Sequence, residues 1–184
     1  MGTPELVPER VDPPASVGRP EATVVPLALT VNGVAYAEGV DPHRTLLRLI
    51  RDDLGLVGPK EGCDDSECGA CMILLDGQPV NACSYLALQA AGRSVTTVEG
   101  LGTADHLHPL QRAFLEAGGI QCGFCTPGML ISAAALLAAD TQPSDEAIRD
   151  ALAGNLCRCT GYQPIFAAVR QAAAELRAED APAS

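Results

Sequence analysis

Eight cysteines constrain this chain of 184 residues more than any other feature of its sequence. Cysteines in that number serve disulfides, zinc or iron–sulfur clusters. Disulfides need an oxidising compartment. Residues 1–22 hold five prolines among scattered charges and no apolar run that reads as an export signal. We therefore expect a reducing, cytoplasmic setting, in which cysteines are more often metal ligands than disulfides.

Charge and composition argue against two classes of partner. The chain has 12 basic and 23 acidic residues, a formal net charge of −11, which disfavours binding to a nucleic-acid polyanion. With 3 Phe, 3 Tyr and no Trp, it is also poor in the aromatic surfaces that stack on bases. The longest apolar run, Met129 to Ala139, is too short to cross a bilayer. We expect neither nucleic-acid binding nor a membrane span.

Two tight turns organise the first half of the chain. Asn32-Gly33 and Asp76-Gly77 each separate two alternating apolar segments, and such pairs predict β-hairpins because both turn residues must take positive φ. The stretch Ser94–Val98 is rich in β-branched residues and predicts a further strand.

A short helix accompanies these strands. Between Thr45 and Leu54, apolar residues recur at helical intervals, and Gly55 follows as a stop. Strands wrapped around one helix make a small α+β unit, which we place at residues 24–100. Residues 1–23 before it are expected to form a flexible, Pro-rich tail.

The second half of the chain, residues 101–184, reads as all-α. Its apolar residues recur at helical spacing behind recognisable helix starts. Four short antiparallel helices predict a helix bundle. The start signals are Pro109, the pair Thr126-Pro127 with Thr126 as N-cap, the N-cap Ser144, and Pro164. We place the boundary between the two domains near residues 100–103.

The first four cysteines are Cys63, Cys68, Cys71 and Cys83. Their C-x4-C-x2-C spacing with a distant fourth cysteine matches the plant-type 2Fe-2S arrangement. Glycines at positions 62 and 69 allow unusual dihedrals, so that backbone N–H groups can approach the sulfur atoms. Zinc is the alternative, but its ligands usually come as two separated C-x2-C pairs.

The last four cysteines are Cys122, Cys125, Cys157 and Cys159. By themselves a C-x2-C and a C-x-C leave zinc, a redox dithiol or coincidence open. A thioredoxin-like dithiol would need a βαβ setting, which this half lacks. Each pair precedes a predicted helix, and helix N-termini stabilise negative charge, which suits an anionic thiolate cluster.

Three motifs taken together resemble one protein family. Residues 60–71, 121–129 and 154–162 are similar to the iron–sulfur subunit of the molybdenum hydroxylases, the xanthine oxidase family, and the resemblance runs from about Leu27 to Leu176. It implies an α+β chain: an N-terminal β-grasp, 2Fe-2S ferredoxin-like domain followed by an all-α four-helix-bundle domain that holds a second 2Fe-2S cluster.

The resemblance also implies the role of each cysteine set. The first four cysteines would hold the cluster that lies toward a flavin, and the last four would hold the cluster toward a molybdenum-pterin cofactor. Gln121 matches a glutamine that touches the pterin; an ordinary polar loop residue is the alternative. Arg158, between two cysteines, either offsets cluster charge or pairs across an interface; the alternative is a surface residue without a role.

The expected function is electron transfer without a substrate site in this chain. Neither a P-loop nor a dinucleotide-binding glycine motif is present. The resemblance implies a large molybdenum-pterin subunit and a medium FAD subunit as partners, assembled as a dimer of heterotrimers. Alternatives within the family are the small subunit of an aerobic carbon monoxide dehydrogenase or of an aromatic-CoA reductase. Alternatives of another class are a free-standing ferredoxin carrier and a structural zinc module.

The three histidines are assigned no catalytic or ligand role, because no nucleophile or carboxylate motif accompanies them. They are His43, His106 and His108.

Overall fold

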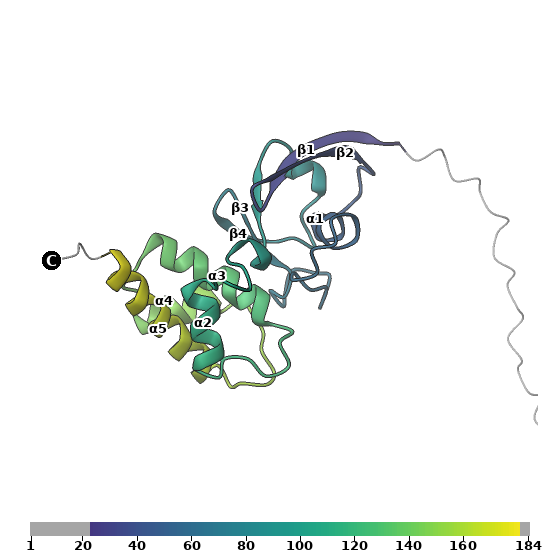
Figure 1. Cartoon of the computed structure of the whole chain (residues 1–184). Helices are drawn as coiled ribbons and strands as arrows, with labels where there is room; N and C mark the ends of the chain where they lie inside the picture. The colour runs from purple at the N-terminus through teal and green to yellow at the C-terminus, as the bar shows by residue number, and fades with distance from the viewer. Residues whose placement is uncertain (1–22, 181–184) are drawn as a thin grey trace, which may run out of the picture.

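A computed structural model describes residues 23–180 of the chain. The tail expected at residues 1–23 lies, except for Thr23, outside the described residues. Figure 1 shows two parts in sequence order: a sheet with one short helix at one end of the molecule and a group of helices at the other. The mixed α and β organisation expected from the sequence is confirmed.

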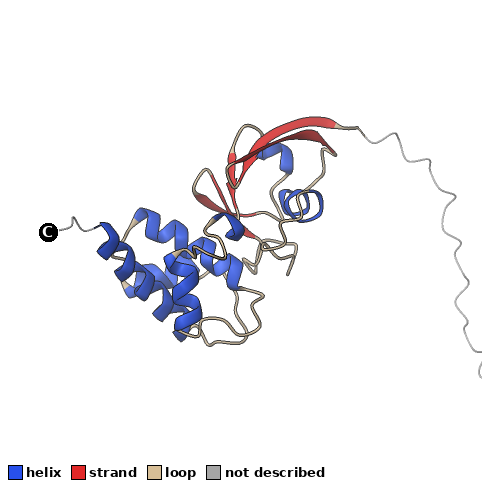
Figure 2. Cartoon of the chain, viewed as in Figure 1, coloured by secondary structure: helices blue, strands red, loops and turns tan. Residues whose placement is uncertain are grey.

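Five strands form one mixed sheet (Figure 2). They are β1 (Val25–Val31), β2 (Val34–Val40), β3 (Met72–Leu75), β4 (Gln78–Asn81) and β5 (Ser94–Thr96). Their order across the sheet is β2-β1-β5-β3-β4, with β1 and β5 parallel and the other neighbours antiparallel. The return of β5 to the middle joins the two hairpins into one sheet.

Both predicted hairpin turns are confirmed. Asn32 and Gly33 have φ of 49° and 81°, and Asp76 and Gly77 have φ of 50° and 80°. Positive φ at both central residues gives the turn the same twist as its strands. The residue pairs Val31–Val34 and Leu75–Gln78 close the two ladders beside these turns.

The helix predicted between Thr45 and Leu54 forms in two parts. The α-helical turn α1 (Leu46–Arg48) runs into a π-helical segment, Leu49–Asp53. The backbone N–H of Leu54 donates to the carbonyl oxygen of Leu49, five residues earlier, at 3.1 Å. A hydrogen bond with this spacing defines the wider, π-helical turn. Gly55 ends the segment with φ of 69°, as expected.

Four longer helices make up the second part. They are α2 (Pro109–Glu116), α3 (Thr126–Ala139), α4 (Asp145–Leu152) and α5 (Gln163–Asp180). The cap predicted at Ser144 is confirmed, since its Oγ accepts from the N–H of Ala147 at 3.1 Å. Two short 3₁₀ segments, Ala87–Ala90 and Val98–Gly100, flank β5.

Two predicted helix starts were wrong by one residue. Thr126 was expected to cap α3, but it is the first helical residue, because the carbonyl oxygen of Cys125 already accepts from the N–H of Met129. The helix α5 likewise begins before Pro164, because the carbonyl oxygen of Tyr162 accepts from the N–H of Phe166. Both cysteine loops therefore run directly into a helix.

Buried apolar side chains gather in two clusters. The first lies between the sheet and α1 and includes Leu46, Ile50 and Ile73, all fully buried. The second lies among α2, α3, α4 and α5 and is centred on Phe114 and Met129. The helix α3 also contacts β3 and β4, so the two parts share one packed surface.

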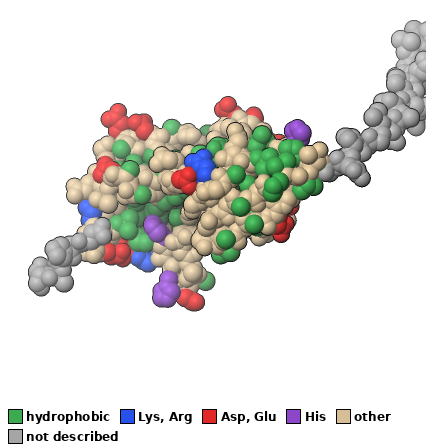
Figure 3. Space-filling model, turned by 90° about the horizontal axis from the view of Figure 1, so that it is seen from above, with side chains coloured by type: hydrophobic (Ala, Val, Ile, Leu, Met, Phe, Trp, Pro, Cys, Tyr) green, Lys and Arg blue, Asp and Glu red, His purple; other side chains and the backbone are tan. Residues whose placement is uncertain are grey.

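The outer surface is mixed in character. Figure 3 shows apolar side chains gathered at the sheet end of the upper face, with acidic groups at its margins. Among the helices of residues 23–180, none has the length and apolar character needed to cross a bilayer.

Candidate metal centres

The first cysteine loop curls because several of its residues take left-handed backbone conformations. Asp64, Ser66 and Gly69 have φ of 59°, 68° and 68°. The expectation of unusual dihedrals is met at Gly69. Gly62 serves differently: a Cβ there would lie 2.8 Å from the Sγ of Cys68, so the glycine leaves room for that sulfur.

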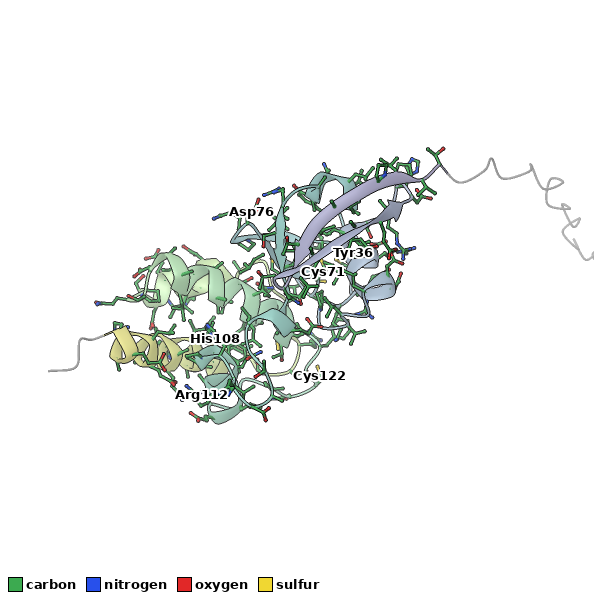
Figure 4. All side chains as sticks on the ribbon, turned by 45° about the horizontal axis from the view of Figure 1, so that its top comes forward. Tyr36, Cys71, Asp76, His108, Arg112 and Cys122 are labelled. Atoms are coloured by element: carbon green, nitrogen blue, oxygen red, sulfur yellow. The ribbon has the colours of Figure 1, made fainter. Side chains whose placement is uncertain are left out.

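The hairpin of β3 and β4 completes this site. Cys71 directly precedes β3, and Cys83 follows β4 by two residues, so antiparallel pairing brings them together. The two thiols lie within hydrogen-bonding reach of each other. Figure 4 shows Cys71 at the inner end of the sheet, toward the helices.

Cys63 and Cys68 form the other pair of this loop. The N–H of Cys68 donates to the Sγ of Cys63 at 3.4 Å, and the two thiols are also hydrogen-bonded. A negative charge on Cys68 raises the pKa of Cys71, so the pair Cys63 and Cys68 lies near the pair Cys71 and Cys83. The first four cysteines thus come together two by two.

Asn81 ties the two sides of the loop together. Its Oδ1 accepts from the thiol of Cys71 at 3.8 Å, and its Nδ2 donates to the carbonyl oxygen of Ser66 at 3.0 Å. The Oγ of Ser66 lies 3.8 Å from the Sγ of Cys83. Sulfur atoms here have polar neighbours that can support thiolate charge.

The pKa values of the thiols in the first cysteine loop are shifted in different directions. Cys71 is 2% exposed, and burial raises its pKa to about 12. Burial also raises the pKa of Cys68. At Cys63 a side-chain hydrogen bond with Asp65 opposes the change, but backbone hydrogen bonds from Asp65 and Cys68 lower the pKa. A buried thiol of this kind becomes a thiolate only when a cation takes the proton's place.

The second cysteine set joins two interhelical loops. Cys122 and Cys125 lie between α2 and α3, and Cys157 and Cys159 lie between α4 and α5. The Sγ atoms of Cys159 and Cys122 are 3.5 Å apart, and both residues are exposed. Figure 4 shows Cys122 at the outer edge of the helical part.

The inner pair of this set is Cys125 and Cys157. Their thiols are hydrogen-bonded, and burial raises the pKa of Cys125 to about 12. Burial opposes ionisation of Cys157 too, but hydrogen bonds with Thr160 outweigh it and lower the pKa of Cys157 to about 7. The Oγ1 of Thr160 lies 3.2 Å from the Sγ of Cys157.

Tyr162 braces the same loop. Its hydroxyl accepts from the backbone N–H of Cys157 at 2.9 Å and donates to the carbonyl oxygen of Asn155 at 3.2 Å. Sequence reasoning assigned no role to Tyr162, Thr160 or Asn155. All three lie inside the last motif, but their contacts with the backbone could not be read from it.

The eight thiols therefore meet as four pairs, and each half of the chain holds two of them. All eight are free. Within residues 23–180, no three His, Cys, Asp or Glu side chains surround one point as a single metal ion requires. A binuclear iron centre needs a different donor set, with two thiolates for each iron, which two neighbouring cysteine pairs could provide.

The remaining residues that the sequence analysis considered are a glutamine, an arginine and three histidines. Gln121 and Arg158 are exposed beside the second cysteine set, and the structure does not test the pterin role of Gln121. His43 and His106 are exposed. His108 has a structural role that the sequence did not reveal: its Nδ1 accepts from the N–H of Leu110 at 3.2 Å and caps α2.

A hollow of about 530 Å³ lies beside β2, away from the cysteines, and is lined by Tyr36, Glu38 and Asp41 among others. Its one guanidinium, on Arg44, lies 2.6 Å from the carboxylate of Asp53, and the hydroxyl of Tyr36 donates to Glu38 at 3.4 Å.

Comparison with protein families matches residues 97–170 to the [2Fe-2S] binding domain. Among known proteins, the chain is 48% identical to the nicotinate dehydrogenase small FeS subunit of Eubacterium barkeri, over 80% of this chain and 94% of the relative. It is 51% identical to a probable xanthine dehydrogenase subunit of Bacillus subtilis, over 75% of this chain and 79% of the relative.

Solved structures are similar over the same region. The quinoline 2-oxidoreductase of Pseudomonas putida 86 matches with a TM-score of 0.81 and 42% identity, over 85% of this chain and 98% of the matched chain. The aldehyde oxidoreductase of Desulfovibrio desulfuricans matches with the same TM-score and 47% identity, but over only 17% of its own chain. In that protein the matching region is one part of a longer polypeptide.

Proposed function

The chain belongs to the iron–sulfur subunits of the molybdenum hydroxylase family, and on that premise we propose that it relays electrons through two 2Fe-2S clusters. It is an electron-transfer subunit of an oxidoreductase complex, without a substrate site of its own. The observation that carries the two-cluster proposal is the pairing of the thiols, because each half of the chain supplies two thiolate pairs. A bound 2Fe-2S cluster takes up and releases one electron at a time.

We assign one cluster to each cysteine set. In the first set, Cys63 with Cys68 would hold one iron, and Cys71 with Cys83 would hold the other. In the second set, Cys122 with Cys159 and Cys125 with Cys157 would do the same. The assignment follows thiol contacts in both sets. N–H and hydroxyl groups beside the sulfur atoms would stabilise the added negative charge of reduction.

The proposed domain organisation matches these two sites. We propose a β-grasp, ferredoxin-like domain over residues 24–100 and a four-helix bundle over residues 101–184. Separate apolar clusters in the two parts support the division. Val98 and Leu101 pack against the apolar cluster of the helical part, which supports a boundary near residues 100–103.

Partners and direction of transfer extend the proposal. We propose a large subunit with a molybdenum-pterin cofactor next to Gln121 and the exposed pair Cys122 and Cys159, and a medium FAD subunit near the first cysteine set. Electrons would pass from the second set to the first. A dimer of heterotrimers and a cytoplasmic location stay predictions of the same kind.

The relatives narrow the reaction class. Their names refer to nicotinate, caffeine, quinoline and aldehydes. We propose that the complex of this chain oxidises an N-heterocycle or an aldehyde. Relatives named as subunits of larger enzymes do not favour a free-standing ferredoxin carrier or a structural zinc module.

The test uses the complex purified with its native partners. Cys83→Ser should remove the first cluster and Cys159→Ser the second, so each variant should lose half of the iron and sulfide and a different signal in the reduced-state electron paramagnetic resonance (EPR) spectrum. Ala153→Ser, an exposed change near the second loop, is the matched control. Stoichiometric zinc, or one variant that removes both signals, would contradict the assignment.

A further inference from the structure

The strand β2 is an open edge of the sheet. It lies at one end of the strand order, and within residues 23–180 no other strand pairs with its outer side. Sheet edges usually carry prolines, bulges or several charges, which discourage pairing with another chain. In β2, seven residues run without a proline and with one charged side chain, that of Glu38. The edge is therefore long enough to take a further strand, and little in its sequence prevents it.

The register of the sheet shows which backbone groups of β2 face this edge. The N–H of Thr30 on β1 donates to the carbonyl oxygen of Arg93 at 3.0 Å, so Thr30 points away from β2. Ala35 lies opposite Thr30 and must point away from β1, because opposed residues that do not bond to each other face in opposite directions. The same alternation applies to Ala37 and Gly39. All three turn their N–H and carbonyl groups to the free edge.

A groove runs along β2, between the strand and the segment that follows α1, and one half of it is apolar. Figure 1 shows α1 facing the hairpin of β1 and β2. A hollow of about 250 Å³ is lined by Val34, Tyr36, Leu54 and Leu56 among others. Tyr36 also lines the hollow of about 530 Å³ beside β2, so the two hollows form one groove along the strand.

The other half of the groove carries negative charge. Its carboxylates belong to Glu38, Asp41 and Asp53, and Arg44 supplies its one guanidinium. Arg44 pairs with Asp53, whereas Glu38 forms no ion pair with any residue between 23 and 180 and accepts only from the hydroxyl of Tyr36. A carboxylate without a cation beside an open edge favours a basic side chain on whatever binds there. Such a charge pair sets register and choice of partner more than affinity.

We propose that the edge of β2 binds an extended segment of a partner subunit, which adds a strand to the five of the sheet. Every second side chain of a strand faces the same way. The apolar half of the groove lies at Val34 and the acidic half at Glu38, four residues along β2. The segment would therefore carry an apolar side chain and, four residues away, a lysine or arginine. The inference rests on the proposed function, because the segment belongs to a partner in the proposed complex.

Two other occupants suit the groove less well. A second copy, paired antiparallel along the whole of β2, would lay the carboxylate of Glu38 against the apolar half of the other copy's groove. No cation meets it there, and burying an unpaired charge is costly. Residues 1–22 of this chain precede β1, but five of them are prolines, which cannot donate to a strand ladder.

Amide hydrogen exchange, resolved to single residues by mass spectrometry, tests the proposal on the purified complex and the isolated chain. The N–H groups of Ala35 and Ala37 should exchange about tenfold more slowly in the complex, because each gains an acceptor on the added strand. The N–H of Tyr36 faces β1 and should be protected in both samples, which makes it the internal reference.

Charge reversal tests the acidic half of the groove. Glu38→Lys should lower the protection of Ala37 in the complex several-fold. Glu146→Lys, at an exposed carboxylate on α4, changes the net charge equally and should keep that protection. A photo-crosslinking residue in place of Tyr36 should couple to a segment of a partner subunit that has an apolar and a basic side chain four residues apart.

Every contrary result identifies a different occupant or none. Equal exchange of Ala37 in the complex and in the isolated chain means an open edge and overturns the inference. Protection in the isolated chain also overturns it, in favour of a second copy if it rises with concentration and of residues 1–22 if their deletion removes it. A crosslinked segment without a basic residue overturns the stated chemistry. The proposed function fails separately, if the same complex lacks two EPR signals.

Discussion

The side-chain amide of Asn155 donates a hydrogen bond to the backbone carbonyl of Gly69, 86 residues earlier in the chain, at a place closed to solvent. This bond joins the loop of the first cysteine set to the loop of the second. Because Ser132 donates to the other end of the same amide, the helix α3 is part of the connection. The relative position of the two sets depends on these few buried polar atoms.

Replacing Asn155 with alanine should destabilise the whole chain. The change leaves the buried hydroxyl of Ser132 without its acceptor, at a cost of about 1–3 kcal/mol. It also removes one of the two donors to the carbonyl of Gly69, which keeps the N–H of Met72. Urea unfolding of the isolated chain, without partner subunits, should give a lower free energy of unfolding for the variant than for the wild type. Gln78→Ala, at an exposed amide on β4, is the control and should change little.

Ser132→Ala tests the same network from the other end. It removes one hydrogen bond, so its effect should be smaller than that of Asn155→Ala and should not add to it in the double variant. Full additivity would mean that the two side chains act independently.

Gly128→Ala should reverse the usual effect of alanine in a helix. A glycine in a helix is ordinarily less favourable than alanine by about 1 kcal/mol. Here the new Cβ would overlap the carbonyl of Gly69, so α3 and the first loop must move apart. We expect a lower melting temperature, measured by circular dichroism.

The matched control for that change is Gly154→Ala. A Cβ at Gly154 has open space around it, so this variant should melt near the wild-type temperature. Equal stability of the two variants would show that the contact between α3 and the first loop can relax without cost.

Asn32 does more than form a turn. Its Oδ1 accepts from the N–H of Thr97 at 2.9 Å and its Nδ2 donates to the Oγ1 of Thr97 at 3.0 Å. Asn32→Gly keeps the positive φ but loses both bonds and leaves the backbone N–H of the buried Thr97 without its acceptor, at a cost of about 1–3 kcal/mol. Chemical denaturation measures this cost. Asn32→Asp keeps the acceptor and should lose less.

Local chemistry explains which features could be predicted from the sequence. The turn at Asn32-Gly33 follows from two adjacent residues, and the cap at Ser144 follows from one helical turn. The contact of Asn155 with Gly69 joins distant segments, and no local pattern indicates it. The start of α3 at Thr126 also depends on the loop before it, whose carbonyl at Cys125 begins the helix.

The candidate cysteine sites, too, could be predicted from the sequence only in part. Spacing indicates four cysteines in each half, but it does not indicate which two thiols meet. The pairing of Cys122 with Cys159 arises because α2, α3, α4 and α5 bring two loops together. Only packing of the helices decides that contact, as it decides the partners of Tyr162.

His108 should make stability depend on pH. Burial lowers its pKa below the usual value of 6.5; the charge of Glu179 opposes the shift, and Arg112 adds to it. In its neutral form Nδ1 accepts the capping hydrogen bond from Leu110, which a protonated Nδ1 cannot do. The unfolded chain therefore binds a proton more readily than the folded chain between the two pKa values.

The contribution of His108 should make the fold less stable in acid. Above pH 6.5 the contribution of His108 is fully present, and it is lost as the pH falls from 6.5 through the lower pKa of the folded state. His108→Asn keeps a good N-cap that does not titrate, so its free energy of unfolding should fall less steeply over this range. The measurement is urea unfolding at several pH values, with His106→Asn, at an exposed histidine, as control. A slope in His108→Asn as steep as in the control would show that another group governs the acid sensitivity of the fold.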